Sequence, residues 1–153
     1  MLVKEPTITV IGSINIDLVT ITDRLPNQGE TISGESFETK PGGKGANQAV
    51  ACAKMGTEVA MIGKVGEDDY GTFLVDQLKN VGVDTSHVLK QGISGRTFIN
   101  VDATGENTIT YVPGANEMLT EKEIEAMDEL LDEAAFLVLQ QEISPAMLKF
   151  VLK

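Results

Sequence analysis

Short runs rich in β-branched residues alternate with longer segments of helical periodicity along this chain, and that alternation limits the possible folds. Residues 7–12 and 57–62 are apolar and β-branched, as expected of buried strands. Residues 46–55 are rich in alanine, and residues 69–81 carry apolar side chains at helical spacing. The alternation favours an α/β fold, a three-layer sandwich with a mostly parallel central sheet.

The middle of the chain interrupts this alternation with further strands. Residues 14–21 alternate partly between apolar and polar side chains, which predicts a strand with one face in water. Residues 24–34 are rich in Pro, Asn and Gly and are expected to form a loop. Residues 96–102 and 107–112 predict a hairpin, because the four residues between them have turn chemistry.

The last third of the sequence predicts two helices around one buried strand. Thr120 and Glu123 form a capping-box pattern that begins a helix over 120–134, whose many acidic residues are expected to form its solvated face. Residues 136–139 are typical of a buried strand, and Ser144 followed by proline predicts the start of another helix.

Charge and cysteine content exclude several partners. The 153 residues, enough for about one domain, carry 12 Lys and Arg against 23 Asp and Glu, a net charge of −11. Such a surface repels nucleic acids and anionic lipids, so neither is expected to bind. No apolar run reaches the roughly 18 residues of a membrane span. A single thiol, Cys52, fits the reducing cytoplasm.

A glycine-rich segment, residues 41–45, precedes the alanine-rich helix. It is not a phosphate-binding P-loop, because glycine follows Lys44 where that motif needs Ser or Thr. Its glycines let the backbone approach a ligand closely, Lys44 adds a cation, and Asn47 offers both a donor and an acceptor. The alternative is a tight strand-to-helix turn with a surface lysine.

Three more polar residues are expected at the same edge of the sheet. Asn15 and Asp17 are two apart on a strand and share a face. Glu142 follows a buried strand at the end where α/β sheets bind ligands. A pocket made by these groups suits a sugar, whose hydroxyls donate and accept. The alternatives are ordinary polar residues on a wet strand for Asn15 and Asp17, and a helix cap for Glu142.

The remaining reactive side chains predict no further chemistry. His87 has no Ser, Asp or Cys pattern around it and is expected to be structural or exposed. Cys52 lies among alanines and is expected to be a small packed residue. Without a cluster of His and Cys, no metal site is expected.

Five segments occur in the order and spacing of one enzyme family. They are residues 12–17 (GSINID), 42–51 (GGKGANQAVA), 65–71 (VGEDDYG), 114–116 (GAN) and 141–142 (QE). The sequence therefore resembles the ribokinase-type carbohydrate kinases along essentially its whole length, and the first two segments favour members that act on ribose.

The resemblance implies a reaction and a binding site. The reaction is phosphoryl transfer from MgATP to the 5-hydroxyl of D-ribose, which gives ribose 5-phosphate. The implied substrate-binding residues are Asn15, Ile16, Asp17, Gly43, Lys44, Gly45, Ala46, Asn47 and Glu142. Segments of about 17–40 and 96–112 would form a small β-sheet lid that covers the sugar and pairs with a second lid in a homodimer.

The sequence departs from the family pattern in two places. The D-T-x-G-A-G-D motif, which carries the family's catalytic base, is absent. The resemblance therefore implies that 1–153 is the N-terminal, sugar-binding portion, with the base beyond Lys153 and with MgATP and a monovalent cation bound by a C-terminal half. Arg96 replaces a small apolar lid residue, so it either changes how the lid meets the sugar or points outward.

Other functions remain open at this point. One alternative is a fructokinase or a nucleoside kinase of the same family. Another is a catalytically inactive fragment that binds sugar or dimerises, and a third is a fragment that binds no ligand and associates through an open sheet edge.

Overall fold

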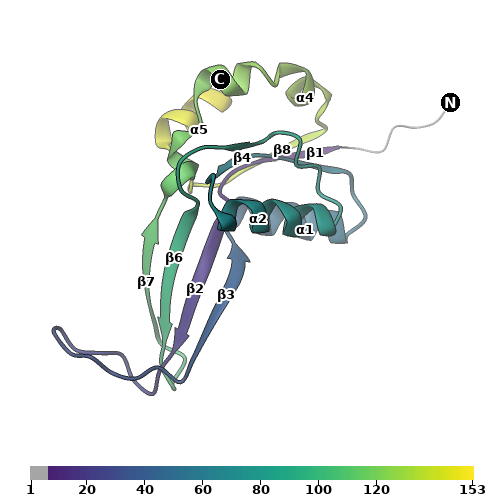
Figure 1. Cartoon of the computed structure of the whole chain (residues 1–153). Helices are drawn as coiled ribbons and strands as arrows, with labels where there is room; N and C mark the ends of the chain where they lie inside the picture. The colour runs from purple at the N-terminus through teal and green to yellow at the C-terminus, as the bar shows by residue number, and fades with distance from the viewer. Residues whose placement is uncertain (1–6) are drawn as a thin grey trace.

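The computed structural model describes residues 7–153, which form a helix-covered sheet and a second sheet that projects from it (Figure 1). The first sheet has four parallel strands in the order β5-β4-β1-β8. Its strands are β1 (Ile8–Ile11), β4 (Val59–Val65), β5 (Val88–Lys90) and β8 (Phe136–Leu139). The expected mostly parallel sheet is confirmed, and β5 is a strand that the sequence analysis did not identify.

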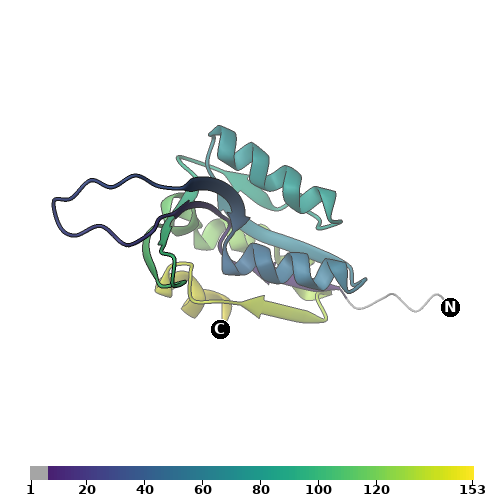
Figure 2. The ribbon, with the colours of Figure 1, turned by 90° about the horizontal axis from the view of Figure 1, so that it is seen from below.

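Helices cover both faces of this sheet, which makes three layers. Helices α1 (Lys44–Lys54) and α2 (Asp69–Asn80) lie side by side on one face (Figure 2). The other face carries the 3₁₀ helix η1 (Gly114–Met118), α3 (Glu121–Glu125), α4 (Asp128–Glu133) and α5 (Pro145–Val151). None of the helices in residues 7–153 is long and apolar enough to cross a membrane.

Two apolar clusters, one on each face of the sheet, hold the layers together. Under α1 and α2, the sheet residues Val10 and Met61 are fully buried with Leu74 of α2. On the opposite face, Ile11 and Ile62 pack with the residues that follow η1. Neighbours along β1 and β4 thus point to opposite faces and are buried on both, so these strands are mostly apolar rather than alternating, with Thr9 and Lys64 as buried polar exceptions.

The second sheet, here called the lid sheet, has the order β3-β2-β6-β7. Its strands are β2 (Asn15–Ile21), β3 (Ser36–Gly42), β6 (Gly95–Val101) and β7 (Asn107–Val112). The predicted hairpin forms β6 and β7, whereas β3 was not predicted as a strand. Pro41 lies in β3, and an edge strand tolerates the missing N–H of proline.

The single helix expected over 120–134 is wrong, because the chain forms two short helices there. The expected capping box of Thr120 and Glu123 is present. However, Met127 leaves helical geometry at φ −113° and ψ 17°. Its amide donates to Ile124 O at 2.9 Å, which closes a tight turn. That turn buries both Ile124 and Met127, and the packing outweighs continuation of the helix.

One acidic residue of this region is not on a solvated face. The Lys64 side chain, from β4, is 1% exposed and forms an ion pair with Glu123 at 2.8 Å. Its ammonium also donates to Gln91 Oε1 at 2.9 Å and to Met118 O at 2.8 Å. The three N–H donors therefore have three partners, and they connect the sheet to η1 and α3.

Candidate functional site

A polar pocket lies where the lid sheet meets the start of α1. Its volume is about 290 Å³. The lining residues are Asn15, Asp17, Gly43, Lys44, Asn47, Thr97, Ile99, Ile109, Tyr111 and Glu142. Six of the nine expected binding residues line this one pocket, although they come from opposite ends of the sequence.

The other three expected residues do not line the pocket. Ile16 is 0% exposed and belongs to the core under α1, because it is adjacent to Asn15 on β2 and therefore faces the other side. Ala46 packs in the same core. Gly45 is buried against the connection between β1 and β2.

The start of α1 approaches the chain before β2 very closely, and Gly43 makes this possible. Gly43 has φ 93°, a left-handed conformation that glycine adopts without strain. A Cβ at this position would lie 2.7 Å from Ser13 O and 2.9 Å from Asn15 N. The glycine therefore brings Lys44 and Asn47 to the same pocket as Asn15.

Glu142 fills the position at the helix N-terminus where an anion is favoured. It accepts from Lys44 N at 3.0 Å and from Ser13 Oγ at 2.6 Å, and it forms an ion pair with the Lys44 ammonium. Partial burial opposes ionisation, but the bonds from Lys44 and Ser13 lower the pKa of Glu142 below its ordinary value. Glu142 is thus both a helix cap and a pocket carboxylate.

Asp17 is the pocket carboxylate without a cation. Among residues 7–153 it takes part in none of the ion pairs. Burial raises its pKa above the ordinary value; a hydrogen bond with Thr97 opposes the shift, and the charge of Glu142 adds to it. A half-buried carboxylate without a counter-ion is suited to accept hydrogen bonds from ligand hydroxyls.

Four residues of the lid sheet were missed by the sequence analysis. They are Thr97 and Ile99 of β6 and Ile109 and Tyr111 of β7. Each pair is two apart and shares a face with Asn15 and Asp17, since Asp17 is in register with Thr97 and Thr97 with Tyr111. Strand alternation was the available signal, but the pairing of β2 with β6 was not predictable from local sequence.

Arg96 does not face this pocket, which agrees with the alternative that its side chain points away from the sugar. It lies on the opposite face of β6, where its guanidinium is 3.2 Å from Asp68 and 5.5 Å from the centre of the Tyr70 ring. Burial opposes ionisation of Asp68, but bonds from Ser94, Gly71 and Arg96 lower its pKa to about 2. Arg96 thus attaches the lid sheet to the start of α2.

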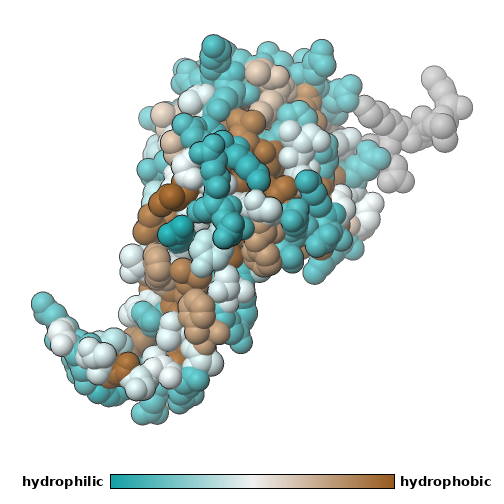
Figure 3. Space-filling model, in the orientation of Figure 1, coloured by the Kyte–Doolittle hydropathy of each residue, from teal (hydrophilic) through white to brown (hydrophobic). Residues whose placement is uncertain are grey.

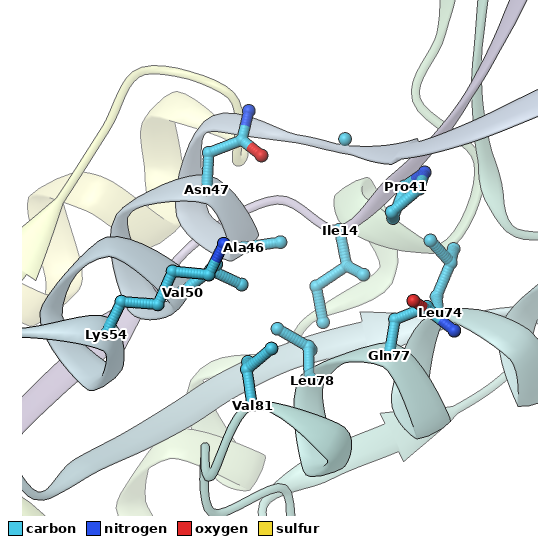
Figure 4. Close-up of a pocket in the computed structure, with 11 residues that line it drawn as sticks. Ile14, Pro41, Ala46, Asn47, Val50, Lys54, Leu74, Gln77, Leu78 and Val81 are labelled. Atoms are coloured by element: carbon cyan, nitrogen blue, oxygen red, sulfur yellow. The ribbon is translucent and has the colours of Figure 1, made fainter.

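An apolar groove lies beside the polar pocket, between α1 and α2 (Figure 4). Its volume is about 190 Å³. Ile14, Val50, Leu78 and Val81 point into it, and Asn47 lines both cavities. The groove offers few hydrogen-bonding groups, so the polar pocket is the better candidate for a hydroxylated ligand.

No group of three or more His, Cys, Asp or Glu side chains that could hold a metal ion occurs within residues 7–153. Cys52 is half-buried against the α1 cluster, which fits the expected packed role, and half-buried His87 lies outside the pocket. The pocket lining offers hydrogen-bonding side chains, the Lys44 ammonium and the carboxylates of Asp17 and Glu142.

Comparison with known proteins identifies the family of this chain. Residues 5–153 match the pfkB family of carbohydrate kinases. The chain belongs to the pfkB carbohydrate kinase family. It is 46% identical over 138 residues to the ribokinase of Bacillus subtilis, and the match covers 89% of the chain and 47% of that enzyme. It is 40% identical to the deoxyribokinase of Salmonella typhi, with coverage of 89% and 45%.

Solved structures of pfkB carbohydrate kinases share this fold. A ribokinase from Arabidopsis thaliana, solved with ribose and ATP, superposes with a TM-score of 0.82 at 32% identity. The superposition covers 94% of this chain and 47% of that enzyme. The chain thus spans somewhat less than half the length of the relatives it matches. A matching ribokinase from Cryptococcus neoformans was solved in complex with ADP.

Proposed function

We propose that this chain is the sugar-binding portion of an ATP-dependent D-ribose kinase that transfers phosphate to the 5-hydroxyl and gives ribose 5-phosphate. The observation that supports it best is the Asp17 carboxylate, which has no counter-ion within residues 7–153 and lies in one pocket with Asn15, Lys44 and Asn47. These groups can both donate to and accept from neighbouring hydroxyls. The identity of 46% to a ribokinase supports ribose as the sugar.

We propose that Asn15, Asp17, Lys44, Asn47 and Glu142 hold the sugar by their side chains. Gly43 and Gly45 act through the close backbone approach at the start of α1. Ile16 and Ala46 support the site from the core, where their side chains pack. The lid segments, about 17–40 and 96–112, cover the sugar and exclude water from it.

The ATP side of the reaction is assigned to sequence outside this chain. The start of α1 is not free to bind a phosphate, because Glu142 accepts from Lys44 N there. The relatives are about twice as long as the matched region. We therefore propose that their remaining half corresponds to the parts that supply the catalytic base, the MgATP site and the monovalent-cation site. The reaction is assigned to the cytoplasm, where ATP is available.

A binding and turnover experiment tests this function. D-ribose titrated into the purified protein should bind with a heat that is absent for a sugar alcohol of the same size. ATP consumption by the 153 residues alone should stay at background, because a base for the attacking hydroxyl is lacking. A His87→Ala variant should bind ribose like the wild type.

The outcomes separate the open alternatives. Preferred binding of D-fructose or adenosine over D-ribose and 2-deoxy-D-ribose would replace ribose by the fructokinase or nucleoside-kinase assignment. Ribose binding without turnover fits a sugar-binding portion. ATP-dependent phosphorylation by these 153 residues would refute the placement of the base, and failure to bind any of the four would refute the site.

We also propose that the protein forms a homodimer through the lid sheet. Large apolar side chains are exposed on its strands, and Figure 3 shows apolar surface along the projecting sheet. Phe37 is 62% exposed and Phe98 42%, and both lie on the face of the lid sheet away from the pocket. Burial of such side chains between two lids is favourable, at about 25 cal/mol per Å² of apolar surface.

Sedimentation of the wild type and of Phe98→Glu tests the dimer. The wild type should sediment as a dimer at micromolar concentration, and Phe98→Glu should shift it toward monomer. An exposed position of α1, Lys54→Glu, is the control and should leave the mass unchanged. A monomeric wild type, or a dimer unaffected by Phe98→Glu, would contradict the lid interface.

A further inference from the structure

Asn116, in η1, is buried directly behind the pocket and touches none of the open space. It is 2% exposed, and Asn15, between it and the pocket, is 3% exposed. Asn116 Oδ1 accepts from Ile14 N at 2.9 Å. Its Nδ2 donates to Pro113 O at 3.0 Å and to Asn15 Oδ1 at 2.7 Å. A hydrogen-bonded chain therefore leads from the backbone to the pocket.

The backbone decides which way both amides point. Ile14 N is a donor, so the atom of Asn116 that faces it must be the oxygen. Pro113 O is an acceptor, so the atom that faces it must be the nitrogen. The nitrogen of Asn116 then requires an acceptor in Asn15. Asn15 therefore turns its oxygen inward and its N–H₂ group toward the pocket and Tyr111.

Gly95 leaves space for this contact. A Cβ at Gly95, the first residue of β6, would lie 2.2 Å from Asn116 Nδ2 and 2.4 Å from Asn15 Oδ1. The hydrogen bond between the two asparagines thus passes directly over a glycine. Gly95 is also the residue at which β6 of the lid sheet begins.

We propose that Asn116 is a positioning residue that fixes the amide of Asn15 so that only its N–H donors face the sugar. This proposal rests on the proposed sugar site and deepens it. The ligand group beside Asn15 must then accept a hydrogen bond from the amide N–H and must donate its own hydrogen bond to another residue. Asp17, on the same face of β2, can accept that hydrogen bond. A hydroxyl can accept from Asn15 and donate to Asp17, whereas a protonated amine has no lone pair to accept from the N–H donors of Asn15.

A double-mutant cycle on D-ribose affinity tests whether Asn116 acts through Asn15. Asn116→Ala alone should weaken ribose binding roughly three- to tenfold, the effect of one neutral hydrogen bond. In an Asn15→Ala background the same change should alter affinity less than about twofold, because the group that it positions is gone. The loss of thermal stability should be smaller in the Asn15→Ala background, because the hydrogen bond between the two asparagines is already absent there.

Two further variants keep the cycle interpretable. Asn116→Asp retains the size and still accepts from Ile14 N, but it turns an oxygen toward Asn15. The Asn15 amide should then reverse, and ribose affinity should fall as in the alanine variant. Asn80→Ala is the control, since Asn80 is an exposed asparagine at the end of α2, outside the pocket and the lid sheet. It should leave affinity unchanged.

Side-chain amide exchange tests the orientation without any sugar. In the wild type, the Asn116 N–H₂ protons should exchange more slowly than those of Asn15, with the Asn15 signals identified by their loss in Asn15→Ala. Asn15 protons protected as strongly as those of Asn116 would overturn the inference even if ribose binds. Equal affinity losses by Asn116→Ala in both backgrounds would also overturn it. If the wild type binds no ribose while the exchange pattern holds, the proposed function fails and the orientation stands.

Discussion

Replacing Glu123 with alanine is expected to lower the free energy of unfolding by about 3–5 kcal/mol. The change leaves the ammonium of Lys64 without a counter-charge, and the Lys64 side chain is 1% exposed. It also removes the capping box at the start of α3. Urea denaturation, followed by circular dichroism, measures the effect. Glu125→Ala, an exposed position of the same helix, should change stability by about 0.5 kcal/mol or less.

Two companion variants separate the charge from the cap. Glu123→Gln keeps the size of the side chain, so its loss of stability reports the charge on Lys64. The double variant Lys64→Met with Glu123→Ala should recover much of the loss, because a buried pair can be replaced by apolar contacts. If Glu123→Ala proves no more harmful than Glu125→Ala, the buried ion pair is not a source of stability.

Replacing Asp17 with asparagine is expected to weaken D-ribose binding on the order of 10- to 100-fold, or about 1.5–3 kcal/mol. The carboxylate accepts charge-assisted hydrogen bonds that the amide cannot match. Titration calorimetry of both proteins measures the difference. Glu58→Ala, an exposed acid before β4 and outside the lid segments, is the control. Unchanged affinity in Asp17→Asn would exclude Asp17 from the site.

The same variant should be more stable than the wild type at neutral pH. Burial raises the pKa of Asp17 in the folded state above the unfolded value of 3.8. Between these two pKa values the folded protein binds more protons than the unfolded protein. The free energy of unfolding therefore falls as pH rises through this window, and it stays lower at neutral pH. Ribose affinity should fall at low pH as Asp17 becomes protonated. A destabilised Asp17→Asn would contradict the raised pKa.

The sequence predicted the fold where local pattern and packing agree. The apolar runs of β1 and β4 and the period of α2 identified their elements, and the caps at Thr120 and Ser144 identified helix starts. The prediction of one helix over 120–134 was wrong because burial of Met127 outweighed the local helix propensity. Strand β3 failed because six of its seven residues are exposed, so no apolar alternation marked it.

The site was predictable at strand ends and beside the glycines, but not on β6 and β7. Asn15, Asp17 and Glu142 follow from strand ends and faces, and Asn47 from its place after the glycines. Tyr111 and Thr97 depend on which strands of the lid sheet pair. Asn116 was visible only as part of a family segment. Its role depends on two backbone groups, Ile14 N and Pro113 O, that come together only in the folded chain.

The attachment of the lid sheet has a mechanical consequence. Asn15, Gly42 and Gly95 are in register at one end of the sheet, and Val112 is in register with the next residue, Arg96, so the strands join the body near one line. Ile99 and Ile109 are paired four residues further out, about 13 Å at 3.3 Å per residue. A rotation of the lid sheet about that line would displace Ile99 and Ile109 much more than Asn15. The polar residue Asn15 thus lies on the axis of such a rotation, and the apolar residues of the pocket lie far from it.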